Sequence, residues 1–120
     1  MKKGFTLLEM LLTVLLLTVG MTSILHMVSR AIFADTNLEN ITTARYLGQE
    51  KMEEIKGAAA YDDIDSYASA RAALTGAFSG FDRAVAVSGD PKQVDVTVYW
   101  TTQGQDQSLR LVTLFADYDY

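Results

Sequence analysis

The feature that most constrains the fold of this chain is an apolar run near its N-terminus. The run extends from Phe5 to Val28, a stretch of 24 residues in which Glu9 is the only charged side chain. A helix needs about 20 apolar residues to cross a bilayer, so the run is long enough to span a membrane. A secretory signal peptide has a shorter apolar part, followed by a cleavage site of small residues, and neither property is found here. The sequence therefore predicts one transmembrane helix at residues 5–28.

The charges on either side of the run predict its orientation. Lys2 and Lys3 precede it, and the part of the chain that follows it is net acidic. Because basic residues favour the cytoplasmic side, we expect a cytoplasmic N-terminus and an exported domain at residues 29–120. The chain has no cysteine, which excludes disulfides and thiolate metal sites but leaves the redox compartment undetermined.

Glu9 is an ionisable side chain one turn into the apolar run, and it needs an explanation. A carboxylate in a membrane is unfavourable by a few kcal/mol, and such groups usually have a specific partner. One explanation is local, because the helix dipole favours an acidic residue in the first turn and Glu9 would then lie among lipid headgroups. The other is a cationic partner on a neighbouring molecule. The geometry of a single span does not decide between them.

The residues that surround Glu9 form a motif. Gly4-Phe5-Thr6-Leu7-Leu8-Glu9, preceded by a short basic leader and followed by a long apolar helix, resembles the class III signal of type IV pilins and pseudopilins. The resemblance implies that residues 1–4 are a leader, that prepilin peptidase cleaves after Gly4, and that the new N-terminal Phe5 is N-methylated. It also implies that Glu9 pairs with the N-terminal ammonium of a neighbouring subunit, which gives the carboxylate its partner.

The same resemblance implies a location and a set of partners. The protein waits in the inner (cytoplasmic) membrane as a single-pass protein and then joins an extracellular or periplasmic filament. Its partners are other pilins or pseudopilins, the prepilin peptidase and the inner-membrane assembly platform. Removal of residues 1–4 takes away two of the 10 basic side chains and leaves 8 against 15 acidic ones, a balance of −7. Direct binding of nucleic acid is therefore not expected.

The helical pattern continues beyond the span. Apolar or small residues recur at three- and four-residue intervals with polar residues between them, which predicts one helix to about residue 56. Lys56 and Gly57 supply a basic last turn and a glycine at the C′ position, where helices commonly end. Residues 49–56 resemble the helix end of minor pilins of the V class and minor pseudopilins of the I class. The predicted inward positions are Leu38, Ile41, Ala44, Gly48, Met52 and Ile55.

The apolar period changes from helical to two after Gly80. Three strand-like runs, at 81–87, 94–100 and 109–115, are separated by turn-forming residues and predict an antiparallel meander. The fold class is therefore α+β, a long N-terminal helix whose second half packs on a small antiparallel sheet of three to four strands. The alternation in the middle run places four residues on the face toward the helix: Val94, Val96, Val98 and Trp100, the last as a core anchor.

The segment between the helix and the first predicted strand is less regular. Its Ala-rich residues 67–74 are expected to form a short helix, capped near Asp65 or Ser66 and ended by Gly76. Three carboxylates lie just before it, on Asp62, Asp63 and Asp65, and calcium favours such oxygen ligands. The spacing matches no EF-hand loop, and a solvated turn is the commoner use of such a cluster. Apart from this weak calcium candidate, we expect no cofactor and no metal site.

Catalysis is not indicated by any motif in the chain. The only histidine, His26, lies at the end of the span and is interpreted as an interfacial polar residue. Without cysteine or a recognised nucleophile, phosphate-binding or zinc motif, neither a histidine-based triad nor a common metal centre can be built. We therefore expect no catalytic residues and no enzyme activity.

These patterns together predict a structural role. The hypothesis is a minor subunit of a type IV pilus or of a type II secretion pseudopilus, matured by prepilin peptidase and assembled through its N-terminal helix into the filament or its initiating tip complex. A non-closing interface of this kind generates filaments rather than rings. The alternative is a membrane-anchored, exported binding module that is not incorporated into a filament, with residues 5–28 as a plain anchor.

Overall fold

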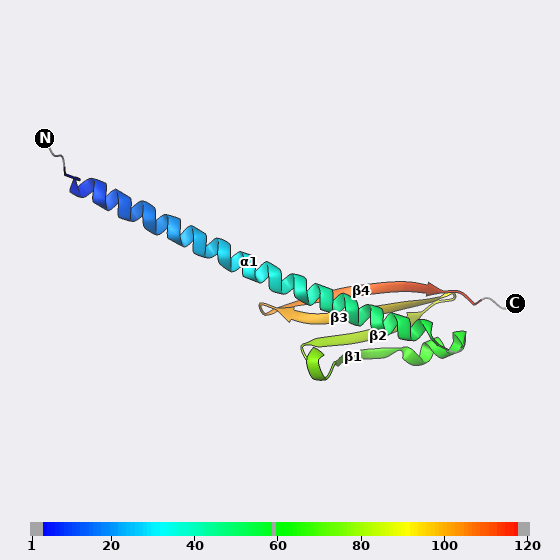
Figure 1. Cartoon of the computed structure of the whole chain (residues 1–120). Helices are drawn as coiled ribbons and strands as arrows, with labels where there is room; N and C mark the ends of the chain where they lie inside the picture. The colour runs from blue at the N-terminus through cyan, green and yellow to red at the C-terminus, as the bar shows by residue number, and fades with distance from the viewer. Residues whose placement is uncertain (1–3, 59, 118–120) are drawn as a thin grey trace. The chain divides into compact units, whose positions relative to one another are not determined.

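The computed structural model describes residues 4–58 and 60–117 of the 120-residue chain. Two compact units make up the chain, residues 1–36 and residues 37–120. Helix α1 (Leu7–Lys56) supplies the regular structure of the first unit and the first element of the second. Figure 1 shows the helix and the four strands of the second unit, β1 (Ser69–Ala73), β2 (Phe81–Ser88), β3 (Lys92–Thr102) and β4 (Gln105–Phe115).

The first unit is helical and has no core of its own among its described residues. Every side chain from Gly4 to Thr36 is exposed, including the leucines and valines of the apolar run. Helix α1 contains a stretch that is long and apolar enough to cross a membrane, and none of that stretch is buried within the chain. The predicted span is thus present as a helix with apolar side chains on all sides, which a bilayer or neighbouring helices can cover.

The end of α1 confirms one prediction and corrects its mechanism. The helix ends at Lys56, as predicted. Gly57 does not take the positive φ of a left-handed C′ glycine. Its N–H donates instead to the carbonyls of Glu53 and Glu54, at 3.1 and 3.2 Å, so that a tightened last turn closes the helix.

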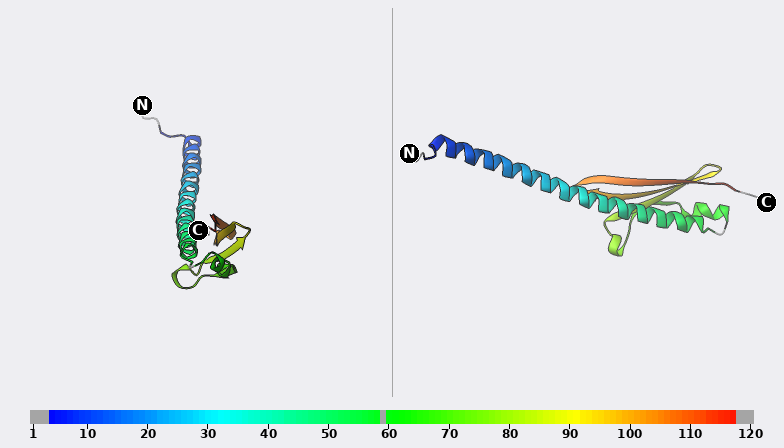
Figure 2. Two further views of the ribbon diagram at one scale, coloured as in Figure 1. Left: turned by 90° about the vertical axis from the view of Figure 1, so that its right-hand side faces the viewer. Right: turned by 45° about the horizontal axis from the view of Figure 1, so that its top comes forward.

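The second unit is a helix on a sheet. The sheet is antiparallel with strand order β1-β2-β3-β4, and the two views of Figure 2 show the C-terminal part of α1 lying along one of its faces. β3 and β4 are joined by a two-residue hairpin loop in which Gln103 and Gly104 have φ values of 54° and 74°. Positive φ at both loop positions matches the right-handed twist of paired strands. The strands can therefore stay paired right up to the two-residue loop, and β3 and β4 extend beyond the predicted runs 94–100 and 109–115.

The core lies between α1 and the inner face of β3. Along β3 every second residue is buried, and the predicted inward set of Val94, Val96, Val98 and Trp100 is confirmed. The ring of Trp100 packs near Ala44 and Leu47 of the helix and at 6.3 Å between centroids from Phe81. The α+β fold class, with the second half of the helix on an antiparallel sheet, is therefore confirmed.

The predicted inward face of the helix is correct except at one position. Ala44, Gly48, Met52 and Ile55 are buried, whereas Leu38 is 61% exposed. The inward line runs backwards from Ala44 through Ile41 to Asn37, so Leu38 lies about 100° to one side of it. Asn37 is half-buried at the position that Leu38 was predicted to fill.

The predicted short helix at residues 67–74 is wrong. Residues 61–67 form the 3₁₀ segment η1 (Tyr61–Tyr67), and the Ala-rich stretch forms strand β1. β1 pairs with β2, and the N–H of Leu74 donates to the carbonyl of Phe81 at 2.9 Å. Arg71 also forms a 2.7 Å ion pair with Asp82 across the two strands. These pairings with the neighbouring strand β2 override the helix preference of alanine.

Candidate functional site at the start of the helix

The peptide bond between Gly4 and Phe5 is placed where a protease can reach it. Both residues precede the first turn of α1 and are exposed, and Phe5 has 79% of its surface accessible. A Cβ built on Gly4 would have no heavy atom within 4 Å. Residues 1–3 of the predicted leader lie outside the described ranges.

Thr6 caps the helix and was not singled out by the sequence analysis. The backbone N–H of Glu9 donates to the Thr6 Oγ1 at 3.2 Å, and the N–H of Met10 donates to the Thr6 carbonyl at 3.1 Å. Thr6 is therefore the N-cap and Glu9 occupies the third helical position, which is the spacing of a capping box. The sequence signal was available, because Thr-x-x-Glu before an apolar run marks such a start.

The cap fixes the position of two groups relative to each other. It starts the helix at Leu7, two residues after Phe5, and it places the Glu9 carboxylate within the first turn, at the positive end of the helix dipole. Cleavage before Phe5 would create an ammonium group at this same end of the helix. The site can therefore present one anion and one cation about one turn apart, in a surface that is otherwise apolar.

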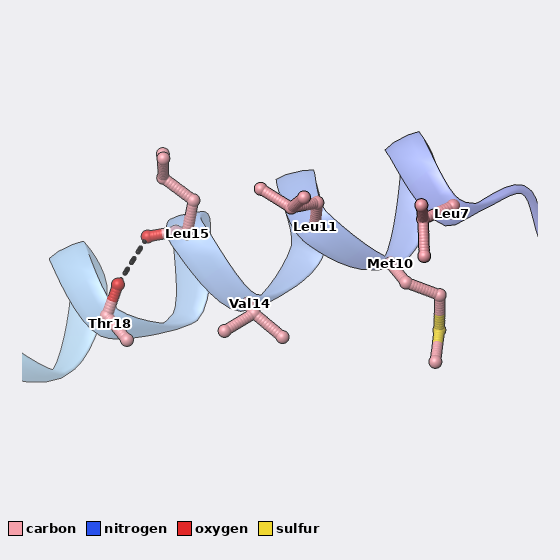
Figure 3. A pocket seen from close by; sticks show the side chains of 6 residues that line it. All are labelled: Leu7, Met10, Leu11, Val14, Leu15 and Thr18. Atoms are coloured by element: carbon pink, nitrogen blue, oxygen red, sulfur yellow. Dashed lines mark hydrogen bonds between the residues drawn. The ribbon is translucent and has the colours of Figure 1, made fainter.

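An apolar stripe follows the cap along α1. Residues at three- and four-residue spacing line a shallow hollow, and Figure 3 shows their side chains on successive turns of the helix. Such a stripe is the form in which one helix packs against another. The residues are Leu7, Met10, Leu11, Val14, Leu15 and Thr18.

Hydroxyl groups within the stripe and beyond it are bonded to the backbone of the same helix. Thr18 donates to the carbonyl of Leu15 at 2.8 Å, as the dashed line of Figure 3 shows. Thr13 donates in the same way to the carbonyl of Glu9, at 2.8 Å. In a membrane, polar groups must find such internal partners, so these hydroxyls are compatible with burial in lipid or between helices.

The second candidate site, at Asp62, Asp63 and Asp65, lies on η1 beside the start of β3. The Lys92 ammonium is 2.9 Å from Asp65 and 3.8 Å from Asp62, and it also donates to the Tyr61 carbonyl at 2.9 Å. The hydrogen bond with Asp65 raises the pKa of Lys92, outweighing the lowering that burial alone would cause. In residues 4–58 and 60–117 no three carboxylate or histidine groups are arranged to hold a metal ion.

His26 lies on α1, beyond the apolar stripe. It lines a shallow hollow together with Ser23, Met27 and Arg30. The position is exposed and lies at the end of the apolar run.

The fold and the start of the helix together define a class of protein. A long N-terminal helix whose second half packs on a four-stranded antiparallel sheet is a pilin-like fold. Comparison with protein families adds that residues 1–25 match the prokaryotic N-terminal methylation motif. The match supports a type IV pilin-like protein with a class III signal, and the apolar helix fits anchoring in the inner membrane. Proteins of the pilin type are in general structural rather than enzymatic.

The match is confined to the N-terminal part of the chain. No curated protein and no solved structure matches this chain.

Proposed function

We propose that the chain is a minor subunit of a type IV pilus or of a type II secretion pseudopilus, in the filament or in the tip complex that initiates it. The observation that carries the proposal is the methylation motif at residues 1–25, set at the start of a helix whose apolar half is exposed on all sides. Other pilins or pseudopilins, the prepilin peptidase and the inner-membrane assembly platform are the proposed partners. The minor role is supported by the resemblance of residues 49–56 to minor subunits.

The proposed maturation uses the groups at the helix start. The prepilin peptidase cleaves the exposed bond after Gly4 on the cytoplasmic side, and Phe5 becomes the methylated N-terminus. The remaining chain is a single-pass membrane protein with its second unit exported, until it enters an extracellular or periplasmic filament. The Glu9 carboxylate then pairs with the Phe5 ammonium of the next subunit, which compensates two charges that are costly in an apolar core.

Two measurements on the full chain in its native membrane test this proposal. The first is the mass of the N-terminal peptide, where loss of residues 1–4 and one added methyl group on Phe5 are expected. The second is the fraction of subunit found in sheared filaments for Glu9→Gln, which we expect to fall at least about tenfold because an uncompensated ammonium remains buried in the core. Glu39→Gln, at an exposed position later on the same helix, is the matched control.

The alternative, an anchored binding module outside any filament, gives different results. In that case Glu9→Gln inserts as well as the wild type or better, and the protein stays in the membrane fraction. An unprocessed N-terminus in a host with active prepilin peptidase would disprove the maturation step.

No cofactor enters the proposal. The Lys92 ammonium supplies a positive charge beside Asp62 and Asp65, where calcium was considered. We expect the thermal midpoint of the second unit to be the same in calcium chloride and in a chelator, measured on the full chain in detergent micelles. A higher thermal midpoint in calcium chloride would show that calcium binds even though the Lys92 ammonium lies beside Asp62 and Asp65.

A further inference from the structure

The two edges of the sheet are protected to different degrees. Strand order places β1 at one edge and β4 at the other, as Figure 1 shows, and within residues 4–58 and 60–117 β4 pairs with β3 only. β1 has five residues and a register shift between Ser69 and Ala72. Short length and irregular register both discourage pairing with a further strand. β4 has neither protection, because its 11 residues keep one register with β3 from Gln105 to Phe115.

The sequence of β4 also lacks the residues that usually block an edge strand. Lysine and proline, which discourage edge pairing in many sheets, do not occur in it. Arg110 is the only charged residue from Gln107 to Phe115. Its guanidinium forms an ion pair with Asp95 of β3, so the charge is held over the sheet rather than beside the free edge. The edge is therefore accessible to another extended segment.

The two-residue loop before β4 determines which backbone groups of the strand are free. The residues that flank such a loop, here Thr102 and Gln105, form a hydrogen-bonded pair, and bonded and non-bonded pairs then alternate along the two strands. The even-numbered residues of β4 therefore direct their N–H and C=O groups away from β3, and they form a row of donors and acceptors along the free edge. These residues are Asp106, Ser108, Arg110, Val112 and Leu114.

Two apolar side chains lie beside this row. Val112 and Leu114 are on the outer face of the sheet, away from the helix, with 51% and 65% of their surface exposed. Their cross-strand partners on β3 are polar, Asp95 for Val112 and Gln93 for Leu114. An apolar neighbour is therefore missing on β3 and can be supplied from the free side of β4. A strand placed there would cover both side chains if it carried apolar residues at the facing positions.

We propose that the free edge of β4 binds an extended segment of a different pilin or pseudopilin, the neighbouring subunit in the filament, which adds to the sheet as a fifth strand. The inference rests on the proposed function, because that function supplies the neighbour. A row of alternating backbone donors and acceptors is complementary to another extended chain, and apolar side chains beside Val112 and Leu114 give the contact its specificity.

The neighbouring subunit is the favoured source of the segment because the helix would already hold it nearby. The apolar half of α1 is exposed on all sides, and in a filament the helices of other subunits cover it. A second contact between two molecules that are already joined is effectively intramolecular, with a local concentration in the millimolar range. One added strand is a weak contact by itself, and this tether makes it sufficient. The edge then selects which subunit lies beside this chain.

Two variants of the full chain test the edge in its native host. Val112→Pro removes an N–H that faces the free edge and leaves the ladder with β3 intact, and Val112→Lys adds a charge that discourages pairing. Each should lower the fraction of subunit in sheared filaments about fivefold, the effect of one lost hydrogen bond. Ala86→Lys is the matched control, because Ala86 is exposed on the same face and lies in the same cross-strand row, but on β2. Urea titration checks that each variant folds, and Val112→Lys decides if the proline variant does not.

Amide hydrogen exchange provides a readout that a contact through side chains alone would not reproduce. In the full chain in detergent micelles, the amides of Leu109, Leu111 and Thr113 should exchange slowly, and those of Arg110 and Val112 quickly. In filaments that contain the labelled subunit, exchange at Arg110 and Val112 should slow at least about tenfold, because a docked strand accepts their N–H groups. Unchanged exchange at these two amides would overturn the proposal.

A photoreactive residue identifies the bound segment. Leu114 is replaced by p-benzoylphenylalanine in the full chain, and intact filaments are irradiated, sheared and analysed by mass spectrometry. The expected product joins position 114 to a segment of another pilin or pseudopilin, and the same replacement at Ala86 should give little of it. A product with a second copy of this chain, with a protein of another class or with lipid would overturn the proposal.

The outcomes separate this inference from the proposed function. If Phe5 is methylated and filaments contain the subunit, but both Val112 variants are incorporated like the wild type, the docking edge is disproved while the proposed function stands. If the N-terminus is unprocessed and no filament contains the subunit, the proposed function fails and this inference fails with it.

Discussion

The two halves of helix α1 have the same backbone and opposite surroundings. From Leu7 to Thr36 every side chain is exposed, whereas from Asn37 to Lys56 one face is buried against the sheet. The first half is apolar almost all round, and the second half is amphipathic. Within the described chain, therefore, only the second half of the helix packs against other elements.

The two halves of the helix should therefore affect different properties of the chain. The second half contributes Ala44, Leu47, Met52 and Ile55 to a core that the unit forms alone, so changes there should alter folding. The apolar residues of the first half have no partner within the described chain, so changes there should alter membrane insertion or association. Each of the following predictions tests that division, on the full chain in detergent micelles.

The largest effect is expected from removing a core side chain of the second half. Ile55 is fully buried among Val94, Val96 and Met52. Ile55→Ala should lower the free energy of unfolding of the second unit by about 3 kcal/mol, because the cavity cannot be filled by solvent or lipid. Urea titration with pulse proteolysis measures it. Leu11→Ala in the first half is the control, and an equal loss there would contradict the division.

Gly48 allows a close approach that a larger residue would block. A Cβ at this position would lie 2.8 Å from the Leu111 Cδ1 and 3.7 Å from the Val98 Cγ2. Gly48→Val should therefore destabilise the second unit by about 2 kcal/mol through overpacking. Gly48→Ala should be close to neutral, since a better helix propensity of about 1 kcal/mol offsets a small movement of Leu111.

The matched control for Gly48 lies in the first half of the helix. A Cβ at Gly20 would meet nothing within 4 Å. Gly20→Val should leave unfolding of the second unit unchanged in the same titration. If both valine variants destabilise equally, the close approach of Gly48 to Leu111 is not the cause, because valine has a better helix propensity than glycine at both positions.

A smaller and more local effect is expected at the cap. Thr6→Ala removes the acceptor for the Glu9 N–H and should weaken the first turn by about 1 kcal/mol. Amide hydrogen exchange should speed up several-fold at Glu9 and Met10, whose N–H groups bond to Thr6, and stay unchanged in the second unit. Thr6→Ser keeps the hydroxyl and should exchange at nearly the wild-type rate. Faster exchange throughout the helix would show that the two halves unfold together.

The smallest effect is expected from pH and is confined to the second unit. Burial alone would raise the pKa of Asp95, but hydrogen bonds from Gln93 and Arg110 outweigh it and the net pKa is lowered from 3.8. A lowered pKa stabilises the fold above the ordinary value, and this contribution disappears as the pH falls below about 4. We expect a loss of less than about 1 kcal/mol, reduced in Asp95→Asn, by urea titration at pH 3 and 6. An unchanged pH dependence in the variant would argue against this role.

The parts of the fold that were predicted correctly are those that local patterns determine. The end of α1, the three runs after Gly80 and the inward face of β3 all follow from hydrophobic periods within one segment. Strand β1 was not predicted, because its Ala-rich sequence has no period of two and its conformation comes from pairing with β2. Leu38 was misplaced because Asn37, a polar residue, occupies the inward line.

The residues of the candidate site also divide into those that a local sequence pattern predicts and those that only the fold brings together. Gly4, Phe5 and Glu9 were predicted from the motif, and their roles in cleavage, methylation and assembly stay predictions. Thr6 could have been identified from its spacing to Glu9, whereas the contact of Lys92 with Asp65 could not, because the two residues are brought together only by the fold.

The position of the only tryptophan gives the second unit a fluorescence signal of its own. Trp100 is 95% buried in the core of the second unit, and residues 1–36 contain no tryptophan. Its fluorescence therefore reports the folding of the second unit alone, with blue-shifted emission when folded and red-shifted emission when unfolded. The state of that unit can be followed in vesicles, in micelles or in an assembled fibre, while the apolar half of the helix remains spectroscopically silent.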